Sequence, residues 1–190
     1  MHDFFADKVF LKEDFTTQKL PKGDYENCTF EDCQFQEGFL DNQLFVESQF
    51  VNCNMTNTNI TNTQFNSVVF TDCKLIGIRF ETCNPLLFAM RFERCNLSLA
   101  SFYEMDIGKT LFQDCRLHQV DFAQADLTGC KFPGCDFENA IFESTILHSA
   151  DLSEAHNFNI DPTQNNIKKA RFSQKGLIGL LKKYDIVLEH

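Results

Sequence analysis

The chain has 190 residues, with 27 acidic and 17 basic side chains, a formal net charge of −10 at pH 7, and 43% hydrophobic residues. This length predicts a single domain without a linker. The opening Met1 to Lys8 is too acidic, and its apolar run too short, for a signal peptide, and no stretch reaches the length of a membrane span. We therefore expect a soluble, cytoplasmic protein.

A five-residue period runs through almost the whole chain. An apolar side chain occupies every fifth position from Phe5 to Phe80, and the series resumes from Leu87 to Leu152 after a shift of two residues. Ile167 and Phe172 continue the second phase. A second position, two residues before each of these, holds a small or modest side chain. Five is neither the helical nor the strand period, so the pattern predicts a solenoid in which four units close a square coil.

Three segments depart from this pattern. Residues 1–20 keep the large apolar positions but place charged or amide side chains at the small ones, which predicts an irregular N-terminal coil. The shift of phase lies in residues 81–86, where Pro85 removes a backbone donor. We expect a kink or a bulge there, and favour a bulge without function. Asn157 and Pro162 interrupt the second phase, so residues 153–166 are predicted to form a loop.

The repeats carry a resemblance to a known family. Segments such as Cys28-Thr-Phe-Glu-Asp-Cys33 and Val120-Asp-Phe-Ala-Gln-Ala125 resemble the pentapeptide-repeat family, whose pattern is a small residue, Asp or Asn, Leu or Phe, Ser or Thr, and Gly. The resemblance covers about residues 21–172. It implies an all-β solenoid, a right-handed quadrilateral β-helix, over residues 1–172.

All nine cysteines fall on the small inward positions, which are Cys28, Cys33, Cys53, Cys73, Cys83, Cys95, Cys115, Cys130 and Cys135. Their spacings are those of the repeat, and no C-x-x-C motif occurs, so a zinc site is disfavoured. We expect small buried hydrophobes, kept reduced in a cytosol. Neighbours in one column, such as Cys33 and Cys53, are expected to lie close enough for oxidation. No cofactor and no metal site are predicted.

The first half of the chain is strongly acidic. Between Gly23 and Cys73 there is no Lys or Arg, and the acidic side chains that we consider for partner binding are Asp24, Glu26, Glu31, Asp32, Glu37, Asp41 and Glu47. One interpretation is a solvated surface that keeps the rod soluble. The other is an acidic face that imitates the phosphate charge of a nucleic-acid duplex and binds a basic protein groove. Either way, the charge argues against direct nucleic-acid binding.

The C-terminal segment, residues 173–187, changes to a helical period. Ser173 is a suitable N-cap, and an apolar stripe follows at Leu177, Leu180, Leu181 and Tyr184. Gly176 and Gly179 lower the intrinsic helix propensity, so packing must hold the helix. The helix is expected to cap the last coil, and its stripe is a candidate surface for a homodimer. Residues 188–190 are interpreted as a possible tag remnant.

This tail is similar to the C-terminus of the quinolone-resistance (Qnr-type) and MfpA-like pentapeptide-repeat proteins. That resemblance implies a rod that dimerises through its C-terminus and acts on DNA gyrase or topoisomerase IV as a DNA mimic. Qnr-type members often carry projecting loops important for protecting gyrase. This chain has no insertion longer than two residues before residue 153, which counts against drug protection.

No catalytic constellation is apparent. His118, His148 and His156 lie at or near outward positions without a recognisable partner spacing, and no Gly-rich phosphate loop occurs. A convex rod also lacks the cleft that would desolvate a pair of carboxylates. We therefore predict a protein that is not an enzyme. The alternatives left open are a gyrase or topoisomerase modulator and a general protein-interaction scaffold.

Overall fold

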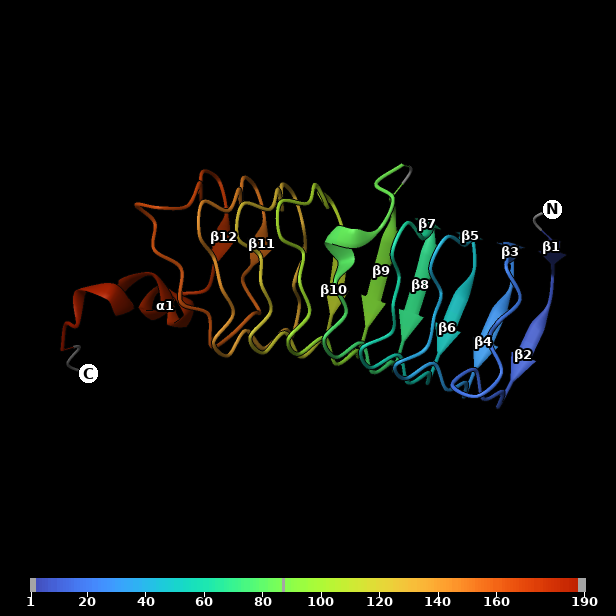
Figure 1. Ribbon diagram of the computed structural model, residues 1–190. Coiled ribbons are helices and arrows are strands. Elements are labelled where there is room, and N and C mark those ends of the chain that lie inside the picture. Colours follow the sequence, from blue (N-terminus) through green and yellow to red (C-terminus); the bar gives the residue numbers. More distant parts are fainter. Residues whose placement is uncertain (1–2, 87, 188–190) are drawn as a thin grey trace.

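The protein is a rod of stacked coils, described by a computed structural model for residues 3–86 and 88–187. The chain winds from one end of the rod to the other, and a short helix follows the last coil (Figure 1). This architecture confirms the predicted fold class, an all-β solenoid with a short C-terminal helix.

Parallel strands line two sides of the first coils. One sheet contains β1 (Asp3–Ala6), β3 (Gly23–Glu26), β5 (Leu44–Val46) and β7 (Gln64–Asn66). The other contains β2 (Val9–Leu11), β4 (Thr29–Glu31), β6 (Gln49–Val51), β8 (Val68–Thr71), β9 (Met90–Glu93) and β10 (Leu111–Gln113). Further along, β11 (Asp151–Leu152) pairs with β12 (Arg171–Phe172).

The pairing register sets the coil length. Phe10 lies opposite Phe30, and Phe30 opposite Phe50, so one coil contains twenty residues. Single bridges with the same offset, such as Gln34 to Asn54 and Phe39 to Asn59, link the two remaining sides. Four five-residue units therefore make one coil, as the period predicted.

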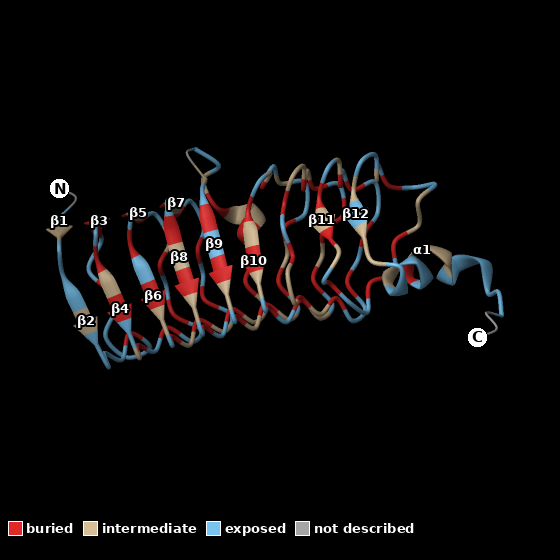
Figure 2. Ribbon diagram, turned by 180° about the vertical axis from the view of Figure 1, so that it is seen from behind, coloured by how far each residue is buried: buried red, intermediate tan, exposed pale blue. Residues whose placement is uncertain are grey.

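The large apolar residues fill the interior of the rod. Phe30, Phe50 and Phe70 are fully buried and stack in one column, with ring centroids 4.7 and 5.1 Å apart. The strand spacing of about 4.8 Å fixes this distance, so the rings adopt the offset stacking that aromatic pairs prefer. Figure 2 shows the resulting alternation of buried and exposed residues along the chain.

The small inward position also satisfies the backbone. The Thr58 hydroxyl donates to the Phe35 carbonyl at 2.8 Å, and the Cys53 thiol donates to the Phe30 carbonyl at 3.2 Å. In both cases the acceptor lies 23 residues earlier, on the preceding coil. A hydroxyl or thiol therefore fits this position because it is small and supplies a donor to a buried carbonyl.

All nine cysteines are buried free thiols. Six of them occupy the same corner of successive coils and form one column inside the rod, comprising Cys33, Cys53, Cys73, Cys95, Cys115 and Cys135. Each is at most 2% exposed. The placement of cysteines on the inward small positions is as the sequence predicted.

Each corner of the coil requires a left-handed residue. Asn52, Asn57 and Asn62 have φ angles of 51°, 53° and 56°, and the same conformation recurs every five residues through most of the rod. Asn and Asp tolerate this region better than most residues because their short side chains bond locally. The frequent Asn and Asp at these positions therefore reflect the turn.

The phase shift leaves the interior stacking intact. Phe70 pairs with Phe92 across 22 residues, and their rings stack at 5.4 Å and 10°. A 3₁₀ helix, Phe80–Thr82, precedes the segment in which the chain leaves the rod as a projecting loop (Figure 1). The two extra residues are thus accommodated outside the coil rather than within the core.

The C-terminal end is closed by new core residues and a helix. The five-residue period assigns Asn157 and Pro162 to the large inward positions. In the structure Phe158 and Ile160 are buried there instead. A 3₁₀ turn, Lys175–Leu177, leads into α1 (Ile178–Leu181) and a second 3₁₀ turn, Lys182–Tyr184. The Ser173 hydroxyl accepts a hydrogen bond from the Gly176 N–H at 3.0 Å, so Ser173 caps this helical segment.

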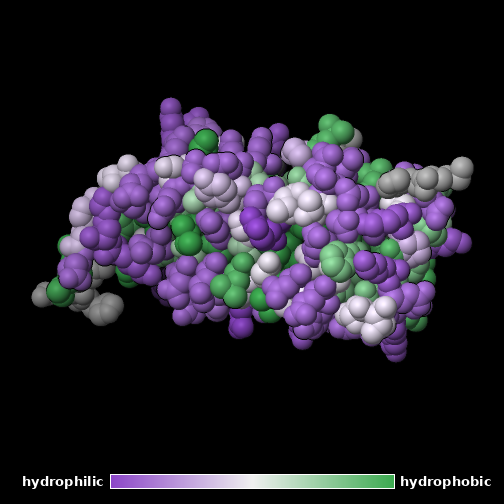
Figure 3. Space-filling view, viewed as in Figure 1, coloured by the Kyte–Doolittle hydropathy of each residue, from purple (hydrophilic) through white to green (hydrophobic). Residues whose placement is uncertain are grey.

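Among the described residues, no helix combines the length and apolarity that crossing a bilayer requires. Figure 3 shows a mainly hydrophilic surface with small apolar patches along the rod.

Candidate functional site

The seven predicted partner-binding carboxylates encircle the rod near its N-terminal end. Asp24 and Glu26 lie on β3, and Glu31 lies on β4, which belongs to the other sheet. The rest of the set, namely Asp32, Glu37, Asp41 and Glu47, follows around the remaining corners into the next coil. The expectation of one acidic face is therefore revised, because residues 24–44 complete a full turn. We call the seven residues the acidic belt.

Lys22, which precedes the acidic belt in the sequence, neutralises the carboxylate of Asp41. Lys22 Nζ lies 2.8 Å from Asp41 Oδ2. Partial burial acts to raise the pKa of Asp41, but the hydrogen bonds from Lys22 and Asn42 outweigh it and hold that pKa below its ordinary value. The sequence gap of 19 residues concealed this pair, since one coil brings the two side chains together.

The glutamates of the acidic belt project into solvent. Glu26, Glu31, Glu37 and Glu47 are all exposed, and none forms an ion pair within residues 3–86 and 88–187. Their charges are therefore available to a basic partner surface.

The C-terminal helix packs on the rod through Gly179, with Leu180 also against the core. A Cβ at Gly179 would lie 2.5 Å from two ring carbons of Phe158, so only glycine allows this approach. Leu180 and Leu181 are partly buried, whereas Leu177 is 46% and Tyr184 52% exposed. The predicted dimerisation residues are thus divided between the contact with the rod and the solvent.

An exposed apolar surface remains at this end. Leu177, Ile178, Tyr184, Ile186 and Val187 all lie among the exposed large hydrophobic residues. We call these five residues the apolar end. It is held in place by Lys183, whose Nζ lies 2.8 Å from both carboxylate oxygens of Asp161. Lys183 lowers the pKa of Asp161 to about 2, with a further contribution from Thr163.

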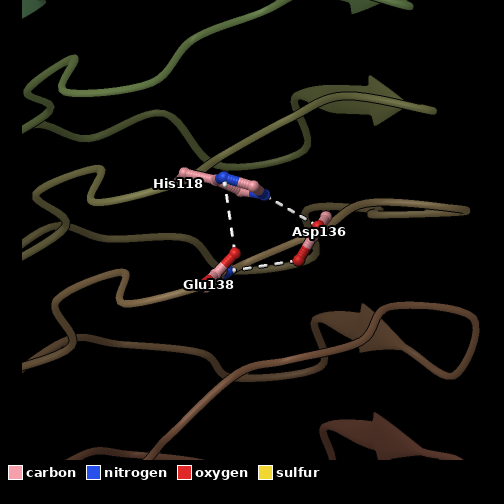
Figure 4. Close-up of side chains that lie close together, drawn as sticks. All are labelled: His118, Asp136 and Glu138. Atoms are coloured by element: carbon pink, nitrogen blue, oxygen red, sulfur yellow. Dashed lines mark hydrogen bonds and ion pairs between the residues drawn. The ribbon is translucent and has the colours of Figure 1, made fainter.

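A third cluster, which the sequence reasoning missed, lies toward the C-terminal half. His118 Nε2 is 2.7 Å from Asp136 Oδ2, and His118 Nδ1 is 3.7 Å from Glu138 Oε2 (Figure 4). His156 Nε2 lies 3.8 Å from the same Asp136 oxygen. We call these four residues the histidine–carboxylate cluster.

The coil length explains how this cluster forms. Glu138 lies one twenty-residue coil after His118, and His156 one coil after Asp136, so two neighbouring columns bring the four side chains together. Partial burial acts to raise the pKa of Asp136, but hydrogen bonds from His118 and Asn157 outweigh it and hold the pKa below its ordinary value. A search for titratable pairs twenty residues apart could have found the cluster.

A groove of about 770 Å³ beside the projecting loop has one cysteine among the described residues that line it. Its lining includes Glu81, Cys83, Glu104 and Asp106. Cys83 is only 7% exposed, and burial raises the pKa of its thiol well above the ordinary value. Because the thiolate is the reactive form of cysteine, Cys83 is unsuited to nucleophilic catalysis at neutral pH.

Two family models match the chain. A pentapeptide-repeat model of eight copies matches residues 48–84, and a pentapeptide-repeat region model matches residues 86–156. Together they cover more than half of the chain. The chain belongs to the pentapeptide-repeat family. No curated protein sequence matches this pentapeptide-repeat protein.

Solved structures of QnrB1, a plasmid-mediated fluoroquinolone resistance protein, share the fold. A trypsin-treated variant of QnrB1 aligns with 99% of this pentapeptide-repeat protein and 92% of its own chain, with a TM-score of 0.76 and 15% identity. Full-length QnrB1 aligns with 97% of this chain and 100% of its own, with a TM-score of 0.58 and 15% identity. At this identity the likeness establishes the fold alone.

Proposed function

We propose that this pentapeptide-repeat protein is a non-enzymatic protein-binding rod that mimics DNA and modulates DNA gyrase or topoisomerase IV. In this proposal the acidic belt contacts the Lys and Arg side chains that normally hold DNA phosphates, and the apolar end joins two chains into a homodimer. The likeness to QnrB1, itself described as a fluoroquinolone resistance protein, supports the choice of a topoisomerase.

The observation that carries the proposal is the charge density of the acidic belt. Its seven carboxylates, on residues 24–47, span little more than one coil spacing, which is about 5–6 Å along the rod axis. Duplex DNA carries one charge per ~1.7 Å of axis, or about three charges over that distance. Even with Asp41 paired to Lys22, the belt is therefore at least as densely charged along its axis as a duplex. A rod of this charge and regularity suits a groove built for a duplex.

The direct test is the supercoiling activity of purified DNA gyrase, with and without a quinolone, over increasing protein concentration. We expect a concentration-dependent effect that weakens as salt is added, because interactions between exposed charges are screened. The variant Glu31→Lys/Glu37→Lys should lose this effect while melting like the wild type, since both side chains are exposed.

A matched control is Glu143→Lys/Glu154→Lys, which makes the same change in charge with two exposed side chains near the other end of the rod. This control should retain the effect if the belt itself is recognised. Absence of any effect, together with no physical binding to gyrase or topoisomerase IV at low salt, would contradict the proposal. That result would favour the second candidate, a general protein-interaction scaffold.

A further inference from the structure

The histidine–carboxylate cluster places two imidazoles and two carboxylates on one region of the rod surface, away from the acidic belt. The donor atoms of His118, Asp136 and Glu138 all lie within 4.8 Å of one another. His156 approaches the same aspartate from the following coil. We propose that His118, Asp136 and His156 bind one late first-row divalent transition-metal ion, such as Zn²⁺, and that Glu138 positions the His118 ring.

The distance between His118 Nε2 and Asp136 Oδ2 suits a metal ion that takes the place of the proton between these two atoms. His118 Nε2 and Asp136 Oδ2 are 2.7 Å apart, whereas two ligands of a tetrahedral zinc ion lie roughly 3.3 Å apart. A side-chain shift of about half an ångström is therefore enough to admit the ion. Both side chains are partly solvent-accessible, at 22% and 26%, so an ion can reach them from solvent.

The third ligand comes from the next coil. His156 Nε2 is 3.8 Å from Asp136 Oδ2, and its side chain is 56% exposed. Solvent exposure lets this imidazole turn, and binding of the ion requires its nitrogen to face the same point as His118 Nε2. Three protein ligands with an open fourth position for water make a common zinc arrangement.

The surrounding contacts orient these ligands. Asn157 Nδ2 donates to Asp136 Oδ1 at 2.8 Å, which leaves Oδ2 to face the two histidines. On the other side of the His118 ring, Glu138 Oε2 lies 3.7 Å from Nδ1. A carboxylate on the distal nitrogen is how metal-binding histidines are usually held, because it fixes the tautomer and raises the basicity of the coordinating nitrogen.

The donor chemistry selects the kind of ion. Imidazole nitrogen favours Zn²⁺, Cu²⁺, Ni²⁺ and Co²⁺ over Mg²⁺ and Ca²⁺, which prefer a shell of oxygens. An aspartate carboxylate is ionised at neutral pH, so Asp136 offers one negative ligand without a proton to displace. The repeat fixes the backbone beneath all four side chains, which limits the rearrangement that binding requires.

The test uses the full chain without an added polyhistidine tag, titrated with Zn²⁺ by calorimetry under reducing conditions. We expect one ion per chain, with affinity reduced at least about 100-fold in His118→Ala and Asp136→Asn. The exposed His156→Ala variant, which should fold normally, is expected to lose at least about tenfold. Glu138→Gln should lose roughly 10- to 100-fold, as outer partners of metal ligands do. His148→Ala, a partly buried histidine outside the cluster, should bind as the wild type does.

Co²⁺ absorption separates this site from the cysteines. Coordination by nitrogen and oxygen gives visible bands without sulfur-to-cobalt charge transfer, and the shape of the spectrum should persist in Glu138→Gln but change in His156→Ala. Sulfur charge transfer, undiminished Zn²⁺ binding by His118→Ala/Asp136→Asn, or no binding at about 100 µM metal would each overturn the proposal. The result is independent of any effect on gyrase.

Discussion

Single residues in the interior act as members of columns. Phe50 contacts Phe30 and Phe70 by stacking and also meets the edges of Phe35 and Phe45. Removing one ring from such a column therefore breaks contacts on three successive coils. The cost should exceed that of an aromatic residue whose ring faces solvent.

We expect Phe50→Ala to lower the free energy of unfolding by about 3–5 kcal/mol, because it removes a fully buried aromatic side chain and leaves a cavity. Urea denaturation followed by circular dichroism measures this change. Phe4→Ala is the control, since that ring is 64% exposed and its removal should cost less than about 0.5 kcal/mol. Equal losses in the two variants would refute the interior assignment.

Buried thiols should make the rod less stable at alkaline pH. Burial raises the pKa of Cys130 to about 12 and also raises the pKa of Cys83. In the unfolded chain both thiols ionise near pH 9, so between pH 9 and 12 the native state holds more protons. Stability is therefore complete below pH 9 and falls above it, by about 1.4 kcal/mol per pH unit for each thiol.

Urea unfolding between pH 8 and 10.5, with a reductant present, measures that slope. Above pH 9 the free energy of unfolding of Cys130→Ala should fall less steeply than that of the wild type, by about 1.4 kcal/mol per pH unit, because one titrating thiol is gone. A slope that is the same with and without Cys130 would show that this thiol is not protected from ionisation in the native rod.

At the scale of elements, the sequence predicted the repeat well and the helix incompletely. The five-residue period identifies the columns because every coil repeats the same two inward positions. The stripe from Leu177 to Tyr184 located the helix but not the face that it turns to the rod. That choice depends on Phe158, which enters the core outside the period and leaves room only for glycine.

The twenty-residue coil also determines which features of the candidate sites are visible in the linear sequence. Linear inspection detected the acidic run at residues 23–73, because charge is visible without a fold. It did not detect the pairing of Lys22 with Asp41 or of His118 with Asp136, since both depend on the coil length. Once twenty residues per coil are accepted, such pairs become predictable from spacing, although side-chain orientation does not.

Gly179→Ala tests how the helix is attached. Alanine raises intrinsic helix propensity by up to about 1 kcal/mol, yet its methyl group would lie 2.5 Å from the Phe158 ring. We expect the helix to detach, so that trypsin cleaves after Lys182 and Lys183 faster than in the wild type. Gly176→Ala gains the same propensity but meets side-chain atoms at 3.0–3.1 Å, so it should show a smaller effect. Equal cleavage rates in wild type and Gly179→Ala would contradict this packing.

At the scale of the whole molecule, the rod separates its two candidate interaction surfaces. The acidic belt lies in the coils near the N-terminal end, and the apolar end follows the last coil (Figure 1). About eight coils give a rod on the order of 40 Å long. A dimer joined through the two apolar ends would therefore place the two acidic belts far apart, one near each outer end, which suits a partner that is itself symmetric.

Light scattering of the full chain at tens of micromolar, roughly the range of a weak interface, tests this assembly. We expect twice the mass of one chain, because Leu177, Ile178 and Val187 expose more apolar surface than an isolated cap would need. Leu177→Glu/Ile178→Glu should give a monomer, since the dimer would bury both carboxylates without partners. Ile141→Glu places the same charge on another exposed isoleucine, on the side of the rod, and should remain dimeric. A monomeric wild type, or dimers in all three proteins, would assign the apolar end to another role.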